Sequence, residues 1–341
     1  MIRSRQAFAA TSIALACAAF CSVASAQSSV SVYGLINMDA GKYQLAGTKS
    51  TYHVDSGNMS TSYLGFKGSE DLGGGLKAVF ALETFLRADN GNSGRYTGDT
   101  FWARSSYVGI GSNYGAVTAG RTTTPLFVST IVLNALGDSF GYSPSVRQWY
   151  GNRSYLLGDS GWNNSITYSS PKVGGAIVTL SGGLGEGTSG AQGKNVGGNV
   201  IYYGGPLTAS IAAQQVRNNS LAGWNTAVSK QNTWQLGAAY DFGVVKPYAQ
   251  YGQIKTDYYT AADSKAKIWG IGMVVPLGGG RLMAQYGDSK LDTTNVKSRI
   301  ATIGYDYSLS KRTDVYVVGM NDRLTSANKG NTIMAGMRHT F

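Results

Sequence analysis

Apolar and polar residues alternate along most of the chain, and this pattern restricts the fold more than any other feature. Successive residues of a β-strand point to opposite faces, so an alternating segment has one apolar and one polar face. The segments 234–241, 281–286 and 301–307 show the pattern clearly. The sequence therefore predicts an all-β fold.

A soluble sandwich and a transmembrane barrel both alternate, and two features favour the barrel. One face is often Gly, Ala, Gln or charged, and the apolar face carries Tyr or Trp near strand ends, where barrels have aromatic girdles. The chain also ends on Phe341, which shares an apolar strand face with Ile333 and Met337. Termini normally fray, whereas in a closed barrel the last strand pairs with the first and leaves no edge.

Turns of two lengths divide the chain into strand-sized segments. Short turns fall at seven places: 71–75, 112–115, 171–175, 204–207, 241–243, 276–280 and 309–313. Longer polar stretches fall at eight: 42–58, 89–98, 125–163, 186–195, 217–230, 257–264, 291–296 and 324–330. Outer-membrane barrels have an even number of strands, with short turns at one end and long loops at the other. The sequence thus predicts a 16-stranded antiparallel transmembrane β-barrel, wide enough to hold an aqueous channel.

Residues 1–26 have the pattern of a cleaved secretory signal peptide. They combine a basic start, an apolar run over 7–20 and a small-residue site ending at Ala26. A membrane anchor is the alternative, but the run is short and rich in alanine. Both cysteines lie inside this segment, so the mature barrel of residues 27–341 would be stabilised without disulfides.

Composition excludes several other classes of protein. The chain has 47 glycines, 22 tyrosines, 6 prolines and only 14% charged residues, which fits short twisted strands better than a soluble α/β enzyme. No apolar run after residue 26 approaches the ~18 residues of a membrane helix. Without the signal peptide, 27 basic residues stand against 18 acidic ones. These cations are scattered among strand segments in an exported protein, so nucleic acid is not an expected partner.

Several motifs resemble the general porins of Gram-negative outer membranes, in the branch typical of beta-proteobacteria. The glycine-rich turn with its following strand and the carboxyl-terminal strand are the most specific. The resemblance covers the chain from its first segment to its last residue and is weakest in the loops. The motifs that carry it are 29–34, 65–80, 107–115, 117–121, 310–316 and 336–341.

The resemblance implies a porin in the cell outer membrane that allows passive diffusion of small hydrophilic solutes and ions. It also implies a homotrimer of 16-stranded barrels in contact with outer-membrane lipid and lipopolysaccharide. The barrel-assembly machinery would recognise the last strand, which ends at Phe341. Each pore would be narrowed by its third external loop.

Residues 125–163 independently fit that third loop. They form the longest stretch without alternation, and a connection of such length is normally functional or disordered. The stretch contains apolar residues that include Phe127, Leu133, Phe140 and Trp149, which could rest on a barrel wall. A structured flap outside the pore is the alternative interpretation.

The alternation of side chains between the two faces of a strand predicts which charges line the lumen. Leu64, Phe66 and Leu82 would face lipid, because a Lys or Arg there costs about 2–4 kcal/mol near the bilayer centre. A narrow place with fixed charges biases which ions enter a pore. The lumen side then carries Lys67, Lys77, Glu83, Phe85, Arg87 and Arg104.

The third loop adds further candidates for the constriction. Strict alternation would point Arg121 to lipid unless a bulge intervenes, whereas the resemblance places it at the pore wall beside the loop. In this family wall arginines commonly face acidic loop groups. Asp138 is the only carboxylate in the central part of the loop, and Arg147 and Arg153 add positive charge. Solvated loop positions are the alternative for each of these charges.

One departure from the family concerns Tyr63. Relatives often have an arginine before the Trp-Gly of the second strand, where this chain has Tyr63-Leu64-Gly65. The loss of that guanidinium argues against strong anion selectivity. The excess of basic over acidic residues in the chain still predicts a weak preference for anions.

Two other functions compete with a general pore. An enzyme needs a base beside a nucleophile or an activated water, and the only histidines are His53 in the first loop and His339 on the lipid-facing side. Neither a metal-ligand cluster nor a cofactor motif is evident, so no cofactor is expected. A dedicated solute-specific channel of the same fold would need an aromatic ladder, and Tyr63, Phe85 and Tyr248 are too few to predict one.

Overall fold

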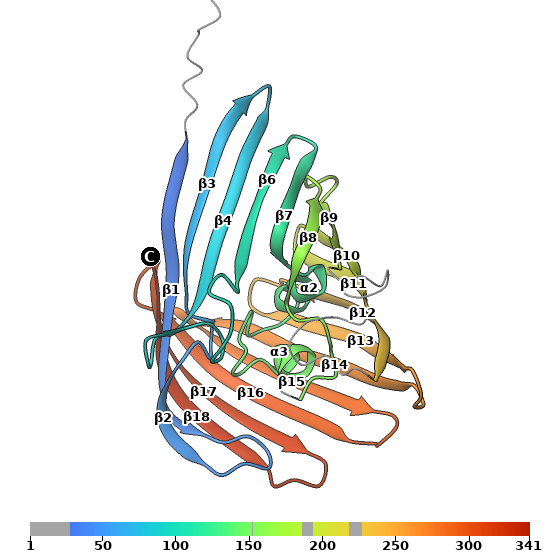
Figure 1. Cartoon of the computed structure of the whole chain (residues 1–341). Coiled ribbons are helices and arrows are strands. Elements are labelled where there is room, and N and C mark those ends of the chain that lie inside the picture. Colours follow the sequence, from blue (N-terminus) through green and yellow to red (C-terminus); the bar gives the residue numbers. More distant parts are fainter. Residues whose placement is uncertain (1–27, 152, 186–193, 218–226) are drawn as a thin grey trace, which may run out of the picture.

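The chain forms a closed 16-stranded antiparallel β-barrel with two short helices inside it (Figure 1). The computed structural model describes residues 28–151, 153–185, 194–217 and 227–341. The predicted signal peptide therefore lies outside the described residues. The barrel strands are β1 (Ser29–Tyr43), β3 (Tyr63–Gly73), β4 (Leu76–Arg87), β6 (Ser105–Ser112), β7 (Gly115–Thr123), β8 (Gly161–Ser169), β9 (Ala176–Gly183), β10 (Asn195–Gly204), β11 (Leu207–Arg217), β12 (Val228–Tyr240), β13 (Lys246–Tyr258), β14 (Ser264–Leu277), β15 (Gly280–Leu291), β16 (Lys297–Ser308), β17 (Thr313–Leu324) and β18 (Gly330–Thr340).

The first strand closes the barrel. The beginning of β1 pairs with β3, and the rest of it pairs with β18 from Leu35↔Thr340 to Lys42↔Ile333. The Phe341 amide donates to the Gly34 carbonyl at 3.1 Å, and the Gly34 amide donates back at 3.2 Å. The last residue is thus held in the sheet, which confirms the predicted pairing of the two ends of the chain.

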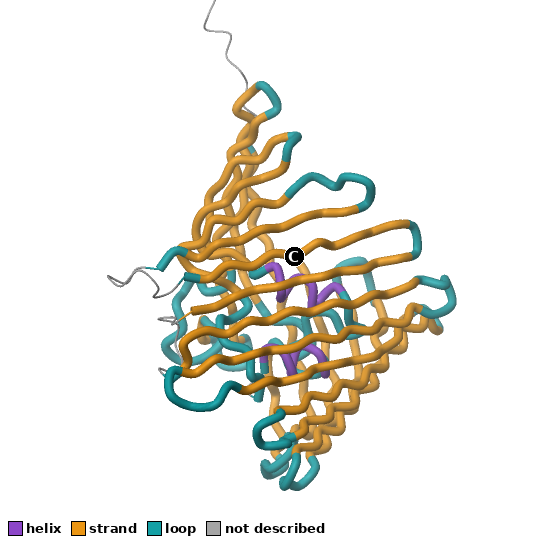
Figure 2. The backbone as a smooth tube through the Cα atoms, turned by 90° about the vertical axis from the view of Figure 1, so that its right-hand side faces the viewer, coloured by secondary structure: helices purple, strands orange, loops and turns teal. Residues whose placement is uncertain are grey.

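All seven predicted short turns connect neighbouring strands, and the longer loops lie at the other end (Figure 2). The turn between β3 and β4 needs glycine, because Gly73, Gly74 and Gly75 have φ values of 81°, 60° and 81°. Two short strands, β2 (Thr51–Ser56) and β5 (Asn92–Ser93), belong to loops and pair antiparallel with β1 and β4.

The third loop runs from residue 124 to 160, so it ends three residues earlier than predicted. The alternation fails there for two local reasons. A register shift between Gly120 and Thr122 marks a bulge in the pairing of β7 with β8. Asn164 has a φ of 49°, which turns the side chains around it out of the regular pattern.

The two faces of the sheet have opposite chemistry. Outward residues such as Leu236 and Ile271 are exposed, whereas the inward Gln231, Thr233 and Gln235 are buried although they are polar. A soluble protein has its polar residues outside and its apolar residues inside. The reverse distribution seen here is that of a barrel whose outer face meets lipid. Neither helix in the described residues is long and apolar enough to cross a bilayer.

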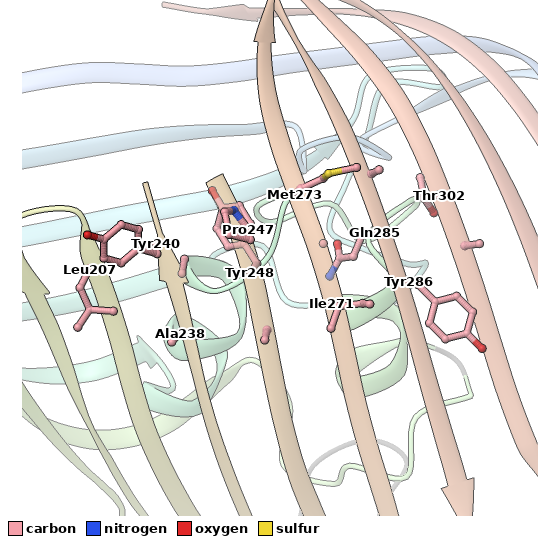
Figure 3. A pocket seen from close by; sticks show the side chains of 15 residues that line it. Leu207, Ala238, Tyr240, Pro247, Tyr248, Ile271, Met273, Gln285, Tyr286 and Thr302 are labelled. Carbon is pink, nitrogen blue, oxygen red and sulfur yellow. The ribbon is translucent and has the colours of Figure 1, made fainter. Parts of the chain in front are cut away.

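A concavity of about 750 Å³ lies on the outer face of β11–β16 (Figure 3). Leu207, Tyr240, Ile271, Met273 and Tyr286 are among the residues that line it. Ile271 is 54% exposed on the face that carries the apolar residues. The concavity therefore faces the membrane and is separate from the lumen.

The third loop packs against the inner wall. Its helices α2 (Pro125–Val132) and α3 (Pro144–Tyr150) each begin with proline after a capping side chain, Thr124 or Ser143. Trp149 is fully buried against the inward side chains of Ile254 and Ile268. Figure 1 shows both helices within the ring of strands. The prediction that the third loop folds into the barrel is confirmed.

Candidate pore constriction

One wall of the lumen carries a compact group of charges and tyrosines from β1, β3, β4 and the start of β6. The Glu83 carboxylate accepts hydrogen bonds from the Tyr33 hydroxyl and the Arg104 guanidinium. Arg104 lies 3.9 Å above the Tyr63 ring, and the Lys67 ammonium lies 4.5 Å from the Tyr33 ring centre. The structure thus brings together Lys67, Glu83 and Arg104, which strand alternation placed on the lumen side, and Tyr63, which the comparison with the family singled out.

The tip of the third loop is fixed to this wall through Asp39. The Tyr142 hydroxyl donates to the Asp39 carboxylate at 2.6 Å, and the Tyr316 hydroxyl donates to the same oxygen at 2.9 Å. The side-chain amide of Asn58 donates to the other carboxylate oxygen of Asp39 at 3.0 Å. Asp39 and Tyr142 are both buried, so neutral donors satisfy this carboxylate away from bulk water.

Asp138 lies beside this anchor and is half-exposed. It accepts a hydrogen bond of 2.8 Å from the Ser60 hydroxyl, which itself accepts one from Arg338 at 3.1 Å. One hydroxyl thus links the predicted loop carboxylate to an arginine of β18. This arrangement places opposite charges on the loop and the wall.

Arg338 also begins a row of charges across β15–β18. Its guanidinium contacts Asp306 at 2.7 Å and Asp314 at 2.8 Å. Asp306 in turn pairs with Arg281 at 2.7 Å. Because these charges alternate in sign, each side chain is held in place by its neighbours, and the net charge of the row is close to zero.

The base of the third loop is held by a second ionic group. The Arg121 guanidinium donates to the Asp159 carboxylate at 3.1 Å and to the Asn163 side chain at 2.7 Å, and it also reaches backbone carbonyls. Arg95 bridges Asp159 at 2.7 Å and Asp99 at 2.9 Å. Burial alone would raise the pKa of Asp159, but the positive charges of Arg95 and Arg121 outweigh it and hold that pKa below its ordinary value.

The bulge in β7 explains why Arg121 does not reach lipid. The family resemblance implied a position at the pore wall, whereas strict alternation would have pointed the side chain to lipid. Its side chain is only 10% exposed and is surrounded by acceptors. Arg121 is therefore beside the third loop, with its charge already compensated. A contribution to ion selectivity stays a prediction for this residue.

The remaining predicted residues line two internal cavities. Arg87 lines a cavity of about 550 Å³ between the loop and the wall, together with Phe140 and Tyr150. Arg147 and Arg153 line another of about 230 Å³. Arg153 pairs with the buried Asp322 at 2.9 Å, so its charge is neutralised locally. The role of each in the constriction also stays a prediction.

Sequence reasoning missed several residues that position the loop. Asp39 and Tyr316 lie on the lumen side by parity, so their direction was predictable. Their common partner Tyr142 was not, because it comes from an irregular loop. Asp159 lies outside the central part of the loop, and Arg95 belongs to another loop, so nothing in the sequence relates the two.

A closed barrel with an apolar outer face, a polar inner face and a loop packed inside is the architecture of outer-membrane channel proteins. Comparison with known proteins then gives the family. The Gram-negative porin family model matches residues 9–327, so the chain belongs to that family.

Individual relatives agree with this assignment. Outer membrane porin protein 32 of Delftia acidovorans is 34% identical over 242 residues, which cover 69% of this chain and 66% of that protein. An outer membrane porin protein of Bordetella pertussis is 25% identical over 95% of this chain and 97% of its own length. The solved anion-selective porin from Comamonas acidovorans superposes with a TM-score of 0.78 at 29% identity, covering 92% of this chain and all of that one. The chain is thus a channel-forming porin of the outer membrane.

Proposed function

We propose that this porin is an open pore for passive diffusion of small hydrophilic solutes and ions, with a weak preference for anions and no enzymatic activity. The constriction lies where the third loop approaches β1–β6 and β16–β18. Fixed charges there act through low-dielectric walls, so a small surplus of one sign biases entry.

The balance of uncompensated charge around the third loop carries this proposal. Within the described residues, Lys67, Arg87 and Arg147 have no carboxylate at ion-pair distance. On the acidic side, the partly exposed Asp55 and Asp138 have no lysine or arginine partner there. The positive surplus is small, which supports a weak preference. The anion-selective relative from Comamonas acidovorans supports its sign.

Reversal potentials across planar bilayers in a salt gradient test the preference. The wild-type pore should pass anions modestly better than cations. Lys67→Gln should lower the anion-to-cation permeability ratio about two- to threefold, because it removes an uncompensated charge from the wall. Lys172→Gln, on the exposed turn between β8 and β9, is the charge-matched control and should leave the ratio unchanged. A clear cation preference of the wild type would refute the proposal.

A dedicated uptake channel of the same fold remains the competing function. Single-channel recording separates the two, because a dedicated channel shows saturable block by one solute at low concentration. A general pore instead passes solutes at rates that fall with their size and do not saturate.

We also propose that the functional unit is a homotrimer in contact with outer-membrane lipid and lipopolysaccharide, inserted by the barrel-assembly machinery. The family implies this assembly, and Phe341 remains 40% exposed on the outer face of the last strand, where a receptor could contact it. Native mass spectrometry in mild detergent should give three times the mass of the mature chain. A monomer under all such conditions would contradict the trimer.

A further inference from the structure

A cavity of about 550 Å³ lies between the third loop and the inner wall, at the end of β4 that bears the long loops. Phe85 and Arg87 line it from the inward face of β4, two and four residues beyond Glu83. Its volume falls within the range of about 300–1,000 Å³ that is typical of sites for small molecules. With the long loops outside, a solute that enters the pore meets this cavity before it reaches the Glu83–Arg104 pair on the wall.

Aromatic side chains from three elements line the cavity: Phe85 of β4, Tyr96 of the second loop, and Phe140 and Tyr150 of the third loop. The ring centre of Phe127 in α2 lies 5.6 Å from that of Phe140 and 4.9 Å from that of Tyr150. Phe127 is only 9% exposed, so it supports both rings from behind. Rings that are already held in place offer flat surfaces to a flat solute at little cost in conformational freedom.

Arg87 is the cation of this cavity with the fewest partners. Its guanidinium makes a long hydrogen bond of 3.4 Å to the Ser93 carbonyl, and no carboxylate of the described residues lies at ion-pair distance from it. Arg95 lines the same cavity, but Asp99 and Asp159 pair with it at 2.9 Å and 2.7 Å. The charge of Arg87 is therefore the one left for a ligand.

The combination of one unpaired cation with several rings restricts the ligand. An inorganic anion would pair with Arg87 but would not use the rings, and a neutral sugar would leave the charge unpaired. A dicarboxylate would place its second charge beside apolar rings and Asp159, whose own partners are Arg95 and Arg121. A monocarboxylate that carries an aromatic ring uses both features, because arginine binds a carboxylate through two parallel hydrogen bonds.

We propose that this cavity is a subsite for aromatic monocarboxylates such as benzoate. The inference rests on the proposed open channel and names a class of solute that this channel retains. The carboxylate pairs with Arg87, while the ring stacks against Phe85 and Phe140. A ligand of so few atoms binds with a Kd of about 1–10 mM. Other small solutes still pass as through an open pore, so the subsite does not make the protein a dedicated channel.

Current through single channels in planar bilayers tests the proposal. Benzoate, cyclohexanecarboxylate or succinate is added to both sides at pH 7, and the concentration that halves the chloride current is measured. Benzoate and cyclohexanecarboxylate have the same charge and similar size, so the ratio of their half-blocking concentrations reports the aromatic ring alone. The wild type should be half-blocked by about 1–10 mM benzoate and by about three- to tenfold more cyclohexanecarboxylate. Succinate should block more weakly than benzoate.

Two pairs of variants separate the contributions of charge and ring. Arg87→Gln should raise the half-blocking concentration of benzoate about tenfold. Its control, Lys67→Gln, removes an unpaired cation from the wall outside the cavity and should change that concentration about twofold at most. Phe85→Leu should bring the ratio between the two ring acids close to one. Its control, Phe242→Leu in the exposed turn between β12 and β13, should leave the ratio unchanged.

Three results would overturn the subsite: equal block by the two ring acids in the wild type, stronger block by succinate than by benzoate, or unchanged block in Arg87→Gln. Chloride conductance without added carboxylate shows which variants have inserted as open pores. If Arg87→Gln does not insert, Arg87→Lys keeps the charge without the planar fork and should still raise the half-blocking concentration about two- to fivefold.

The subsite and the channel can fail separately. A wild-type protein that conducts chloride but is not blocked by benzoate would refute the subsite and leave the channel standing. Binding of benzoate to the detergent-solubilised protein is measured in parallel by saturation-transfer NMR. A protein that binds benzoate there but forms no pore in bilayers would refute the channel and leave the cavity as a binding site.

Discussion

The third loop is held at two places that use different chemistry. Its base is fixed by an ionic group, in which Asp159 joins Arg121 and Arg95. Its tip is fixed by neutral donors, in which Tyr142 and Tyr316 share the Asp39 carboxylate. A buried carboxylate can be satisfied either by opposite charge or by several hydrogen bonds. The two anchors should therefore fail under different conditions, although they hold the same segment.

Removal of Arg121 should have the largest effect. Arg121→Met leaves the Asp159 carboxylate with one cation and leaves the Asn163 side chain without this donor. Loss of one partner from a largely buried ionic group costs about 3–5 kcal/mol. Urea unfolding in detergent micelles measures it, with Arg312→Met in the exposed turn between β16 and β17 as the control. A loss as small as that of the control would show that the base anchor is dispensable.

Acid should weaken the base before the tip of the loop. The pKa of Asp159 lies below its ordinary value, so its stabilising contribution is complete above pH ~3.9 and is lost as the pH falls from there through the lowered pKa. We expect the conductance to become progressively noisier as the pH falls below about 4, because protonation of Asp159 weakens the base anchor and leaves the loop held mainly at its tip. Asp159→Asn should show this noise already at pH 7. A wild-type channel whose noise does not rise at any pH below 4 would contradict the prediction.

The smallest effect is expected at the tip. Tyr142→Phe removes one of the donors to Asp39 and should cost about 1 kcal/mol, since Tyr316 and Asn58 remain. Burial, the negative charge of Asp39 and the hydrogen bond to it all raise the pKa of Tyr142. The contribution of Tyr142 is thus complete below pH ~10 and is lost as the pH rises further. Unfolding measured from pH 8 to 11 should show a smaller loss in Tyr142→Phe than in the wild type, because other buried tyrosines such as Tyr150, whose pKa burial also raises, lose their contribution in both proteins.

The charged wall of the lumen was largely predictable, because side-chain direction in a strand is a local property. Lys67, Glu83 and Arg104 follow from counting along β3, β4 and β6. Counting along β7 gave the wrong direction for the Arg121 side chain, since the bulge depends on how β7 pairs with β8. The contacts of the third loop could not be predicted from the sequence for a second reason. Asp39 lies 103 residues from Tyr142 and 277 from Tyr316, and no local pattern relates positions so far apart.

The sequence by itself determined the all-β architecture, the number of strands, the inner and outer faces and the existence of a long third loop. Period-two alternation and turn length decide these features residue by residue. Only the tertiary structure decided that the loop rests on the inner wall through two chemically distinct anchors, and that Arg87 shares a cavity with aromatic side chains from two loops. Closure of the barrel fixes the register of every strand, and that register brings distant side chains within bonding distance.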